Sequence, residues 1–227
     1  DDNMPDNIVY LNGSYVKDAE ATVSIFDRGF TNGDWTYDVT RTFGHKPFQL
    51  RDHIARLYRS LEFIQLDPGL TQDQMYDVTL EGVRRNEKSL GPRDDFSITH
   101  RVSRGIGGLT PGSYRPTVLV HCDRIVFERF AQHLVDGGNL VIASTRRTPP
   151  ASIDPKVKNR TLNFVLADLE GQAIDPSAWV LMLDVRGFLS ECTSKNIFLV
   201  RAGDLCTPKR DYVLEGVTRA TILDMAP

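Results

Sequence analysis

The feature that most constrains the fold is an Asn12-Gly13 pair set between two short runs of strand-forming residues. An Asn-Gly pair in that setting is a strong local signal for a tight β-hairpin, because both residues tolerate the left-handed backbone of the turn. We therefore predict paired strands at 8–11 and 15–16, followed by an alternating, strand-like run from Ala21 to Ile25. A chain that opens in this way favours an antiparallel sheet. The next segment, 26–38, is rich in aromatic and charged residues and contains Gly29 and Gly33, so we predict a loop there.

Further strands are predicted in the N-terminal half. A second hairpin is expected to pair 40–43 with 47–50, and strands at 96–104 and 117–122 flank the glycine cluster 105–108. That cluster lacks a following helix and the spacing of the dinucleotide-binding fingerprint, so we reject a dinucleotide site.

Two helices are predicted between these strands, one N-capped by Asp52 and one from Thr71 to Glu87. The first has an apolar stripe at helical spacing, made of Ile54, Leu57, Leu61 and Ile64. Arg56 lies near the positive end of this helix, where a basic side chain is unfavourable unless it faces an anion. Arg56 is therefore a candidate phosphate contact, and an ordinary surface arginine is the alternative.

The second half follows a different pattern. A connecting helix or linker at 124–135 leads to a strand at 140–144 and a helix that runs through Glu170. The strands predicted after that helix are 179–184, 188–192, 197–200 and 204–206. Their close spacing and glycine turns indicate a mixed or barrel-like β domain. The fold class is therefore α/β, more broadly α+β, with domains at 1–124 and 125–227.

Lys158 lies between a segment predicted to be extended and an apolar helical run. A lysine becomes a nucleophile for carbonyl groups when burial or a neighbouring positive charge lets its amine lose a proton near neutral pH. Lys156 and Arg160 could supply that positive field. A solvated surface lysine is the commoner role for such a residue, so the sequence pattern alone leaves both readings open.

Two further sequence features, Glu191 and the segment 216–218, could form a site together with this lysine. Glu191 lies inside an apolar strand-like segment, where a carboxylate requires a cationic or hydrogen-bonding partner. Gly216, Val217 and Thr218 precede a helix, and backbone N–H groups at a helix start form a cradle for phosphate. The alternatives are a structural salt bridge for Glu191 and an ordinary helix cap for the glycine and threonine.

Composition narrows the classes of partner. A net charge of -3 and a pI near 6.0 give no signature of polyanion binding, so we expect no nucleic-acid partner. No apolar run reaches membrane-spanning length and the acidic N-terminus does not resemble a signal peptide, so we expect a cytoplasmic protein without membrane contact. The three cysteines lack the spacing of metal ligands, and we expect buried thiols, no disulfide framework and no metal.

Five motifs, in this order, resemble the class IV, or fold type IV, pyridoxal-phosphate enzymes. That family includes branched-chain and D-amino-acid aminotransferases, (R)-selective amine transaminases and aminodeoxychorismate lyase. The motifs are Phe26-Asp-Arg-Gly-Phe30 with Gly33-Asp34 and Tyr37, His53 to Leu57, Lys158-Asn159, Leu189 to Phe198, and Thr207-Pro208 with Leu214 to Arg219. The resemblance covers nearly the whole chain, and the motifs are specific when taken jointly.

The resemblance implies a small α/β N-terminal domain, a larger mixed C-terminal domain and a pyridoxal 5'-phosphate cofactor. Lys158 would bond covalently to the cofactor, Glu191 would partner its pyridinium nitrogen, and Leu214 would pack on its ring. The residues that would surround its phosphate are Arg56, Gly216, Val217 and Thr218. Family members share their site between two subunits, so a homodimer is also implied.

The resemblance also reaches the substrate pocket, to which it assigns Asn32, Trp35, Tyr37, Arg41 and Thr99. Trp35 and Tyr37 would form an aromatic wall for an apolar amine, whereas an amino acid requires a cation for its carboxylate. The candidates for that cation are Arg41, His100, Arg101 and Arg104, and the alternative for each is a surface charge or a structural pair.

The expected function is transamination between an amine or amino acid of R or D geometry and a 2-oxo acid such as pyruvate or 2-oxoglutarate. The rivals are a branched-chain L-amino-acid aminotransferase, an aminodeoxychorismate lyase and a non-catalytic relative. Relatives continue beyond the point where this sequence stops, Pro227, with a second phosphate-binding threonine segment. We therefore expect the sequence to be truncated relative to the family.

Overall fold

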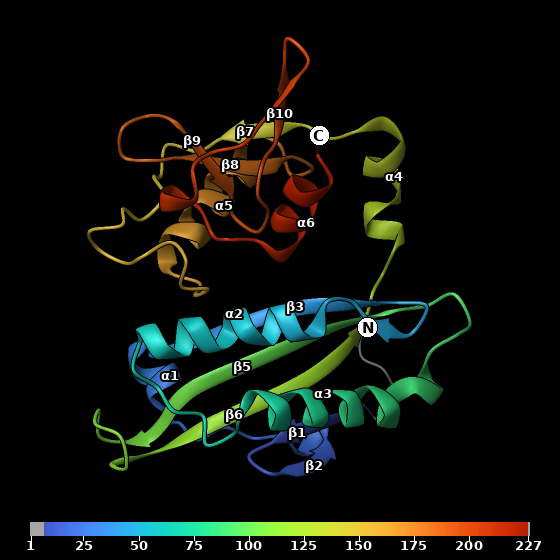
Figure 1. Ribbon diagram of the computed structural model, residues 1–227, viewed down its shortest axis with the longest axis vertical. Helices are drawn as coiled ribbons and strands as arrows, with labels where there is room; N and C mark the ends of the chain where they lie inside the picture. Colours follow the sequence, from blue (N-terminus) through green and yellow to red (C-terminus); the bar gives the residue numbers. More distant parts are fainter. Residues whose placement is uncertain (1–6, 227) are drawn as a thin grey trace. The chain divides into compact units, whose positions relative to one another are not determined.

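The N-terminal part of the chain is built on one antiparallel sheet (Figure 1). The computed structural model describes residues 7–226. The chain divides into two compact units, Asp1–Phe127 and Glu128–Pro227. The domains predicted at 1–124 and 125–227 stay a prediction, because compactness alone does not test whether each unit folds independently.

The N-terminal sheet has the strand order β2-β1-β6-β5-β3-β4. Its strands are β1 (Ile8–Leu11), β2 (Ser14–Lys17), β3 (Trp35–Phe43), β4 (Lys46–Pro47), β5 (Phe96–Gly107) and β6 (Tyr114–Arg124). The predicted first hairpin is confirmed, with Asn12 and Gly13 at φ of 49° and 95°. The second hairpin is also confirmed, although its return strand is only two residues long.

Two parts of the predicted strand pattern are wrong. The run from 21 to 25 forms no strand, and the segment predicted as an aromatic loop forms the short helix α1 (Arg28–Asn32) followed by β3. The reason for this helix lies in Asp27, whose Oδ1 accepts hydrogen bonds from the Gly29 N–H and the Ser103 hydroxyl. Its Oδ2 accepts from the Thr117 hydroxyl, so the segment is tied to β5 and β6.

Helices α2 (Leu50–Phe63) and α3 (Gln72–Asn86) cover one face of this sheet. The predicted stripe on α2 packs against the sheet, with Ile54, Leu57 and Leu61 at most 1% exposed, while Ile64 is partly buried. Full burial of such a side chain contributes about 1.5–3 kcal/mol. The predicted N-cap Asp52 is wrong, because α2 starts earlier and Gln49 holds the N-cap position. The predicted start of α3 is confirmed by a capping box between Thr71 and Gln74.

The two faces of β3 differ in burial. Thr36, Asp38, Thr40 and Thr42 are buried on the face that α2 and α3 cover. Trp35, Tyr37, Val39 and Arg41 are half-buried on the opposite side, which we call the open face. Cross-strand pairing extends the open face to β5 and β6, because Arg101 pairs with both Tyr37 and Leu119.

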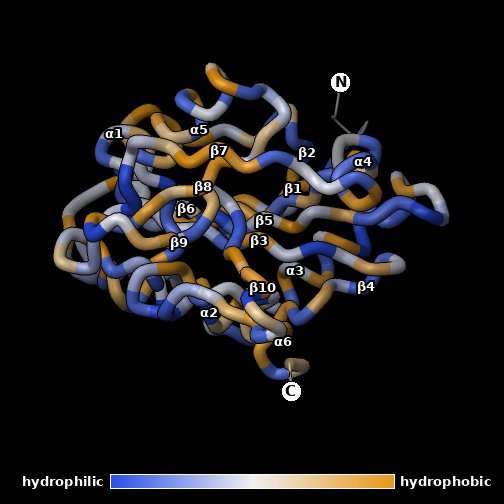
Figure 2. Tube along the Cα trace, turned by 90° about the horizontal axis from the view of Figure 1, so that it is seen from above, coloured by the Kyte–Doolittle hydropathy of each residue, from blue (hydrophilic) through white to orange (hydrophobic). Residues whose placement is uncertain are grey.

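The C-terminal unit contains a mixed three-stranded sheet. Its strands are β7 (Leu140–Ile142), β8 (Trp179–Leu183) and β9 (Leu189–Cys192), with β7 parallel and β9 antiparallel to β8. Helix α5 (Leu162–Ile174) packs Phe164 and Ala167 on this sheet, and β8 has the hydrophobic colouring of a core strand (Figure 2). A Cβ on Gly171 would lie 2.2 Å from a Val180 methyl, so this close approach requires glycine.

The predicted short strands of this unit are confirmed as mixed β structure. The remaining elements are α4 (Glu128–Asp136), β10 (Leu199–Arg201), β11 (Asp204–Cys206) and α6 (Val217–Met225), with 3-10 turns η1 (Asp18–Glu20), η2 (Glu87–Ser89) and η3 (Arg210–Tyr212). β10 and β11 form a separate hairpin. The predicted connecting helix is confirmed by α4.

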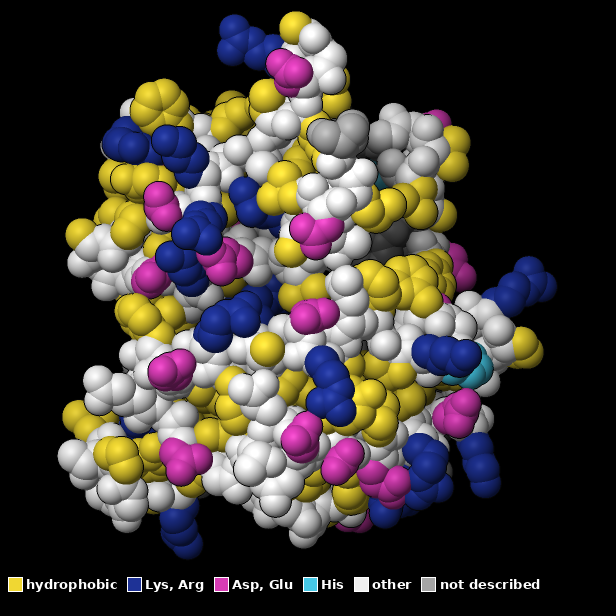
Figure 3. Space-filling view, in the orientation of Figure 1, with side chains coloured by type: hydrophobic (Ala, Val, Ile, Leu, Met, Phe, Trp, Pro, Cys, Tyr) yellow, Lys and Arg dark blue, Asp and Glu magenta, His cyan; other side chains and the backbone are white. Residues whose placement is uncertain are grey.

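Several surface features bear on the predicted partners. None of the helices in residues 7–226 is long and apolar enough to cross a membrane. On the visible face, acidic and basic side chains are interspersed (Figure 3). Cys122 and Cys192 are buried thiols, but Cys206 is exposed, so the prediction of three buried thiols is wrong for Cys206. Within the described part of the chain, no group of three or more His, Cys, Asp or Glu side chains forms a metal site.

Candidate active site

Glu191 is the buried charge around which the C-terminal site is built. Strand β9 places it between two buried neighbours, and it is 4% exposed. Its Oε1 accepts a hydrogen bond of 2.8 Å from Nε of Arg147, itself buried. Its Oε2 accepts bonds from the Leu214 N–H (3.0 Å) and from the Asn196 amide (3.1 Å). The carboxylate therefore has the partners that its burial requires.

Opposing influences act on the protonation of Glu191. Burial raises the pKa of its carboxyl group, while Arg147, the Leu214 N–H and the positive charge of Lys158 lower it. Burial outweighs the rest, so the pKa lies above its ordinary value. The ionised form of Glu191 therefore depends on the nearby cations.

Lys158 precedes α5 in an irregular segment. The extended lead-in predicted for it is wrong, because β7 ends at Ile142 and turns occupy the intervening chain, including one closed by the Val157 N–H on the Asp154 carbonyl. Lys158 is half-buried, whereas Lys156 is exposed. Arg160 pairs with Asp168 at 2.7 Å, so its charge is partly offset and contributes less to the predicted positive field.

The start of α6 lies beside Glu191. Gly216 holds the N-cap position and has no side chain to cap the first N–H groups of α6, which leaves them for an anion. A Cβ on Gly216 would lie 2.1 Å from the Asn196 Oδ1, so Asn196 requires this glycine. The Asn196 amide donates to Glu191 and to the Leu214 carbonyl. The structure thus brings Glu191, Leu214 and the Gly216–Thr218 segment together.

Sequence reasoning missed two members of this network, Arg147 and Asn196. The sequence shows that Glu191 requires a cation. Its partner Arg147 lies 44 positions away, and the sequence does not distinguish Arg147 from the neighbouring Arg146 as that cation. Asn196 falls within the motif that resembles the family, and that was the available signal.

Arg56 belongs to the N-terminal unit and has a buried partner there. Its Nε and Nη2 donate to the Asp38 carboxylate at 2.7 and 2.8 Å, and His53 Nδ1 lies 2.7 Å from the same group. Burial would raise the pKa of Asp38, but the hydrogen bonds from His53 and Arg56 outweigh burial and lower it to about 2. The proposed phosphate contact of Arg56 stays a prediction.

Acid should destabilise the N-terminal unit through Asp38. A fall in its pKa from 3.8 to about 2 corresponds to roughly 2–3 kcal/mol of stability. The folded-state pKa is the lower one, so this stability is present above pH 3.8 and is lost as the pH falls towards 2. Urea unfolding between about pH 6 and pH 2 tests this, with Asp38→Asn as the comparison. If the free energy of unfolding fell equally with pH in both proteins, the lowered pKa of Asp38 would be contradicted.

The predicted substrate residues lie in the N-terminal unit. Trp35, Tyr37, Arg41 and Thr99 lie on the open face, and the Trp35 and Tyr37 ring centroids are 5.4 Å apart, which supports an aromatic wall. Asn32 is exposed at the end of α1. The Arg41 guanidinium lies 3.3 Å from Asp95 and 4.0 Å from the Phe43 ring centre.

Two candidate carboxylate contacts, His100 and Arg104, form structural pairs, the alternative that the sequence left open for them. His100 is fully buried beneath the helices, lies 2.9 Å from the Thr79 hydroxyl, and has a pKa that burial lowers to about 4. Arg104 is buried, with Nε 2.7 Å from Asp34. Its guanidinium also donates to the carbonyls of Ile64, Gln65 and Leu109. Neither side chain is available to a substrate.

The donor set in the C-terminal unit fits pyridoxal phosphate. A buried carboxylate suits a protonated ring nitrogen, and the uncapped start of α6 suits a phosphate. A half-buried lysine close enough to act on that carboxylate electrostatically suits the aldehyde carbon. The network through Asn196 joins the first two of these groups.

Comparisons with known proteins agree with this fit. Residues 35–227 match the family model described as amino-transferase class IV. A Methanocaldococcus jannaschii protein with the provisional name branched-chain-amino-acid aminotransferase is 36% identical, over 96% of this chain and 74% of its own. The branched-chain-amino-acid aminotransferase-like protein 1 of Arabidopsis thaliana is 32% identical over 90% of this chain, which spans 37% of that longer protein.

A solved structure gives the same fold. The branched-chain aminotransferase of Thermoproteus uzoniensis with norvaline matches at a TM-score of 0.84 and 28% identity, over 96% of this chain and 74% of that one. Class IV aminotransferases use pyridoxal phosphate. The chain therefore belongs to the class IV aminotransferases, a family of pyridoxal-phosphate-dependent enzymes of fold type IV.

Proposed function

We propose that this enzyme moves an amino group between an amine or amino acid of R or D geometry and a 2-oxo acid such as pyruvate or 2-oxoglutarate. The observation that carries the proposal is the buried Glu191 carboxylate, hydrogen-bonded to the segment before α6 and electrostatically coupled to Lys158. One network thus supplies an anion, an amine and an anion-binding helix start. The R or D preference rests on the resemblance of 32–39 and 146–159 to (R)-selective amine transaminases.

Each proposed residue has a role that follows from its chemistry. Bound pyridoxal phosphate supplies the electron sink that lets a donor C–H bond break. Lys158 Nζ would accept the released proton and later return one. Glu191, whose ionised form Arg147 favours, would accept a hydrogen bond from the protonated ring nitrogen. The N–H groups of Val217 and Thr218 would hold the phosphate.

The second candidate is a branched-chain L-amino-acid aminotransferase, favoured by the names of the more similar relatives and structures. A D-alanine aminotransferase of Staphylococcus haemolyticus, 28% identical, favours the first candidate. The third candidate is a lyase, favoured by a Bacillus subtilis relative named aminodeoxychorismate lyase that is 27% identical. A homodimer and a cytoplasmic location stay predictions, as do the absence of nucleic-acid and membrane partners and the roles of the substrate-pocket residues.

Half reactions separate these candidates. The holoenzyme is mixed with (R)-1-phenylethylamine, D-alanine or L-leucine, and the loss of its visible cofactor absorbance is followed. We expect faster loss with the first two donors, and recovery of the absorbance when pyruvate or 2-oxoglutarate is added. Loss with L-leucine alone would contradict the R or D preference and support the branched-chain candidate. Release of pyruvate from aminodeoxychorismate, without recovery by any oxo acid, would support the lyase.

A further inference from the structure

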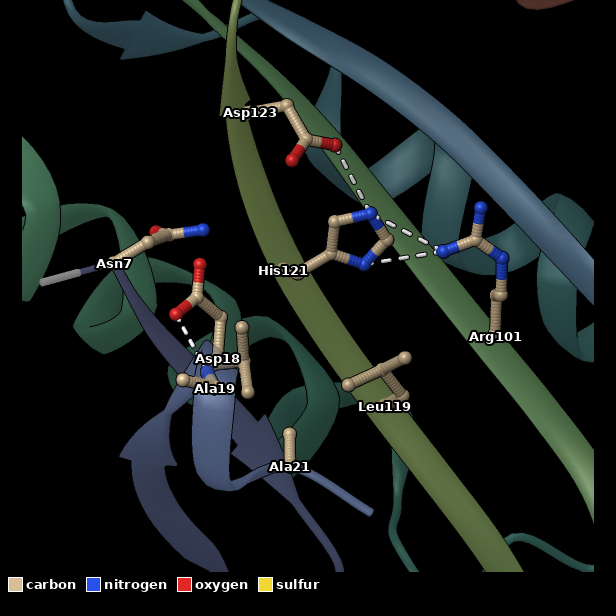
Figure 4. Close-up of a pocket in the computed structure, with 9 residues that line it drawn as sticks. Asn7, Asp18, Ala19, Ala21, Arg101, Leu119, His121 and Asp123 are labelled. Carbon is tan, nitrogen blue, oxygen red and sulfur yellow. Dashed lines mark hydrogen bonds and ion pairs between the residues drawn. The ribbon is translucent and has the colours of Figure 1, made fainter. Parts of the chain in front are cut away.

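The open face of the N-terminal sheet contains a pocket of about 390 Å³ that the proposed function does not use (Figure 4). Val9 of β1 and Leu119 of β6 contribute to its lining. The chain turns into η1 after β2, and the Asp18 N–H donates to the Asn7 carbonyl at 2.9 Å. This bond fixes η1 and Ala21 as a wall of the pocket, and all of the lining residues belong to the N-terminal unit.

One side of the pocket is cationic. Arg101 of β5 is exposed, and its Nη1 lies 3.1 Å from Nε2 of His121 on β6. Asp123 lies 3.0 Å from the same His121 nitrogen. Among the described residues, no carboxylate forms an ion pair with Arg101. A planar guanidinium with no anionic partner in the described part of the chain suits a carboxylate, which it can bind with two parallel hydrogen bonds.

The other side of the pocket accepts hydrogen bonds. Asp18 presents its carboxylate there, on the side of the pocket away from Arg101 in Figure 4. Asn7 is 5% exposed, and its Oδ1 is buried without a hydrogen-bond partner in the described part of the chain. A buried acceptor without a partner is unfavourable, and a ligand that donates hydrogen bonds would relieve this cost.

We infer that this pocket binds a free, neutral α-amino acid with a small aliphatic side chain. Its carboxylate would meet Arg101, and its ammonium group would meet Asp18 and Asn7 Oδ1. The side chain would lie on the apolar lining formed by Val9, Ala19, Ala21 and Leu119. Asp18 and Asp123 repel a second carboxylate, so acidic amino acids fit poorly. Arg101, a candidate for the substrate carboxylate by sequence, would then serve this second site.

Calorimetric titration tests the inference on holoenzyme that has been reduced with borohydride, so that Lys158 no longer exchanges with added amines. The probes are D- and L-valine, isobutylamine, which lacks the carboxylate, and isovalerate, which lacks the ammonium group. Saturable binding of valine is expected, with binding of either partial ligand weaker by about 10-fold or more. Arg101→Gln and Asp18→Asn should each weaken valine binding by about 10- to 100-fold.

Arg115→Gln is the matched control, because Arg115 is an exposed arginine on β6 that does not line the pocket. It should bind valine as the unmodified protein does, and thermal unfolding of each variant checks that it is folded. Equal binding of valine by all three variants would overturn the inference, as would no saturable binding of valine. Isovalerate binding as tightly as valine would also overturn it, in favour of a simple anion site. None of these outcomes depends on the half reactions that test the proposed function.

Discussion

Replacing Lys158 with alanine should remove the covalent link to the cofactor and lower turnover by at least about 10³-fold. The reason is that the half-buried Lys158, in the role proposed for it, would supply both the nucleophile and the group that moves the proton. The measurement is kcat for the fastest donor and oxo-acid pair from the half reactions, together with the visible absorbance of the bound cofactor.

Lys156→Ala is the matched control for this variant. Lys156 is two positions away but exposed, so its loss should change turnover by less than about 3-fold. The assignment would be contradicted if Lys156→Ala lost turnover and Lys158→Ala kept it.

Replacing Arg147 with methionine should lower the free energy of unfolding by about 3–5 kcal/mol, because it leaves Glu191 buried without its cation. The Arg147 guanidinium lies 4.8 Å from the centre of the Phe164 ring, and a methionine side chain can pack on the same ring, so the change removes the charge while much of the packing is kept. Urea unfolding at pH 7 measures the change.

The effect of Arg147→Met should also depend on pH. Burial already raises the pKa of Glu191, and removing Arg147 raises it further. A folded-state pKa above the unfolded value destabilises the protein as the pH rises above 4.5, so the loss should grow from pH 4.5 towards 7. The control is Arg51→Met, which breaks an ion pair with Asp73 in which both side chains are exposed, and should cost less than about 1 kcal/mol. A loss of the same size for both variants would contradict the role of Arg147.

Local signals predicted those parts of the fold that local interactions determine. The Asn12-Gly13 hairpin and the capping box of Thr71 each depend on residues within a few positions. The segment after Phe26 depends instead on Asp27, which is held by hydroxyl groups 76 and 90 positions away. Such long-range interactions leave no local pattern in the sequence, so helix α1 and the start of strand β3 were predicted as a loop.

The same distinction applies to the site. Glu191 could be selected from sequence because a carboxylate in an apolar strand requires a partner. Its partner Arg147 could not be separated from Arg146, since the choice depends on which side chain points at the carboxylate. The sequence also could not decide whether Arg104 and His100 are free to bind a substrate carboxylate. The tertiary structure gives each of them a buried partner, Asp34 for Arg104 and Thr79 for His100.

Identifying the residue that carries the cofactor tests the assignment of Lys158 without relying on any substrate. The purified holoenzyme is reduced with sodium borohydride, which makes the lysine–cofactor bond permanent, and is then digested and mapped by mass spectrometry. We predict one cofactor mass added to the peptide that contains Lys158, at that residue. Addition at Lys156, at another lysine, or at none in the presence of excess pyridoxal phosphate would contradict the assignment.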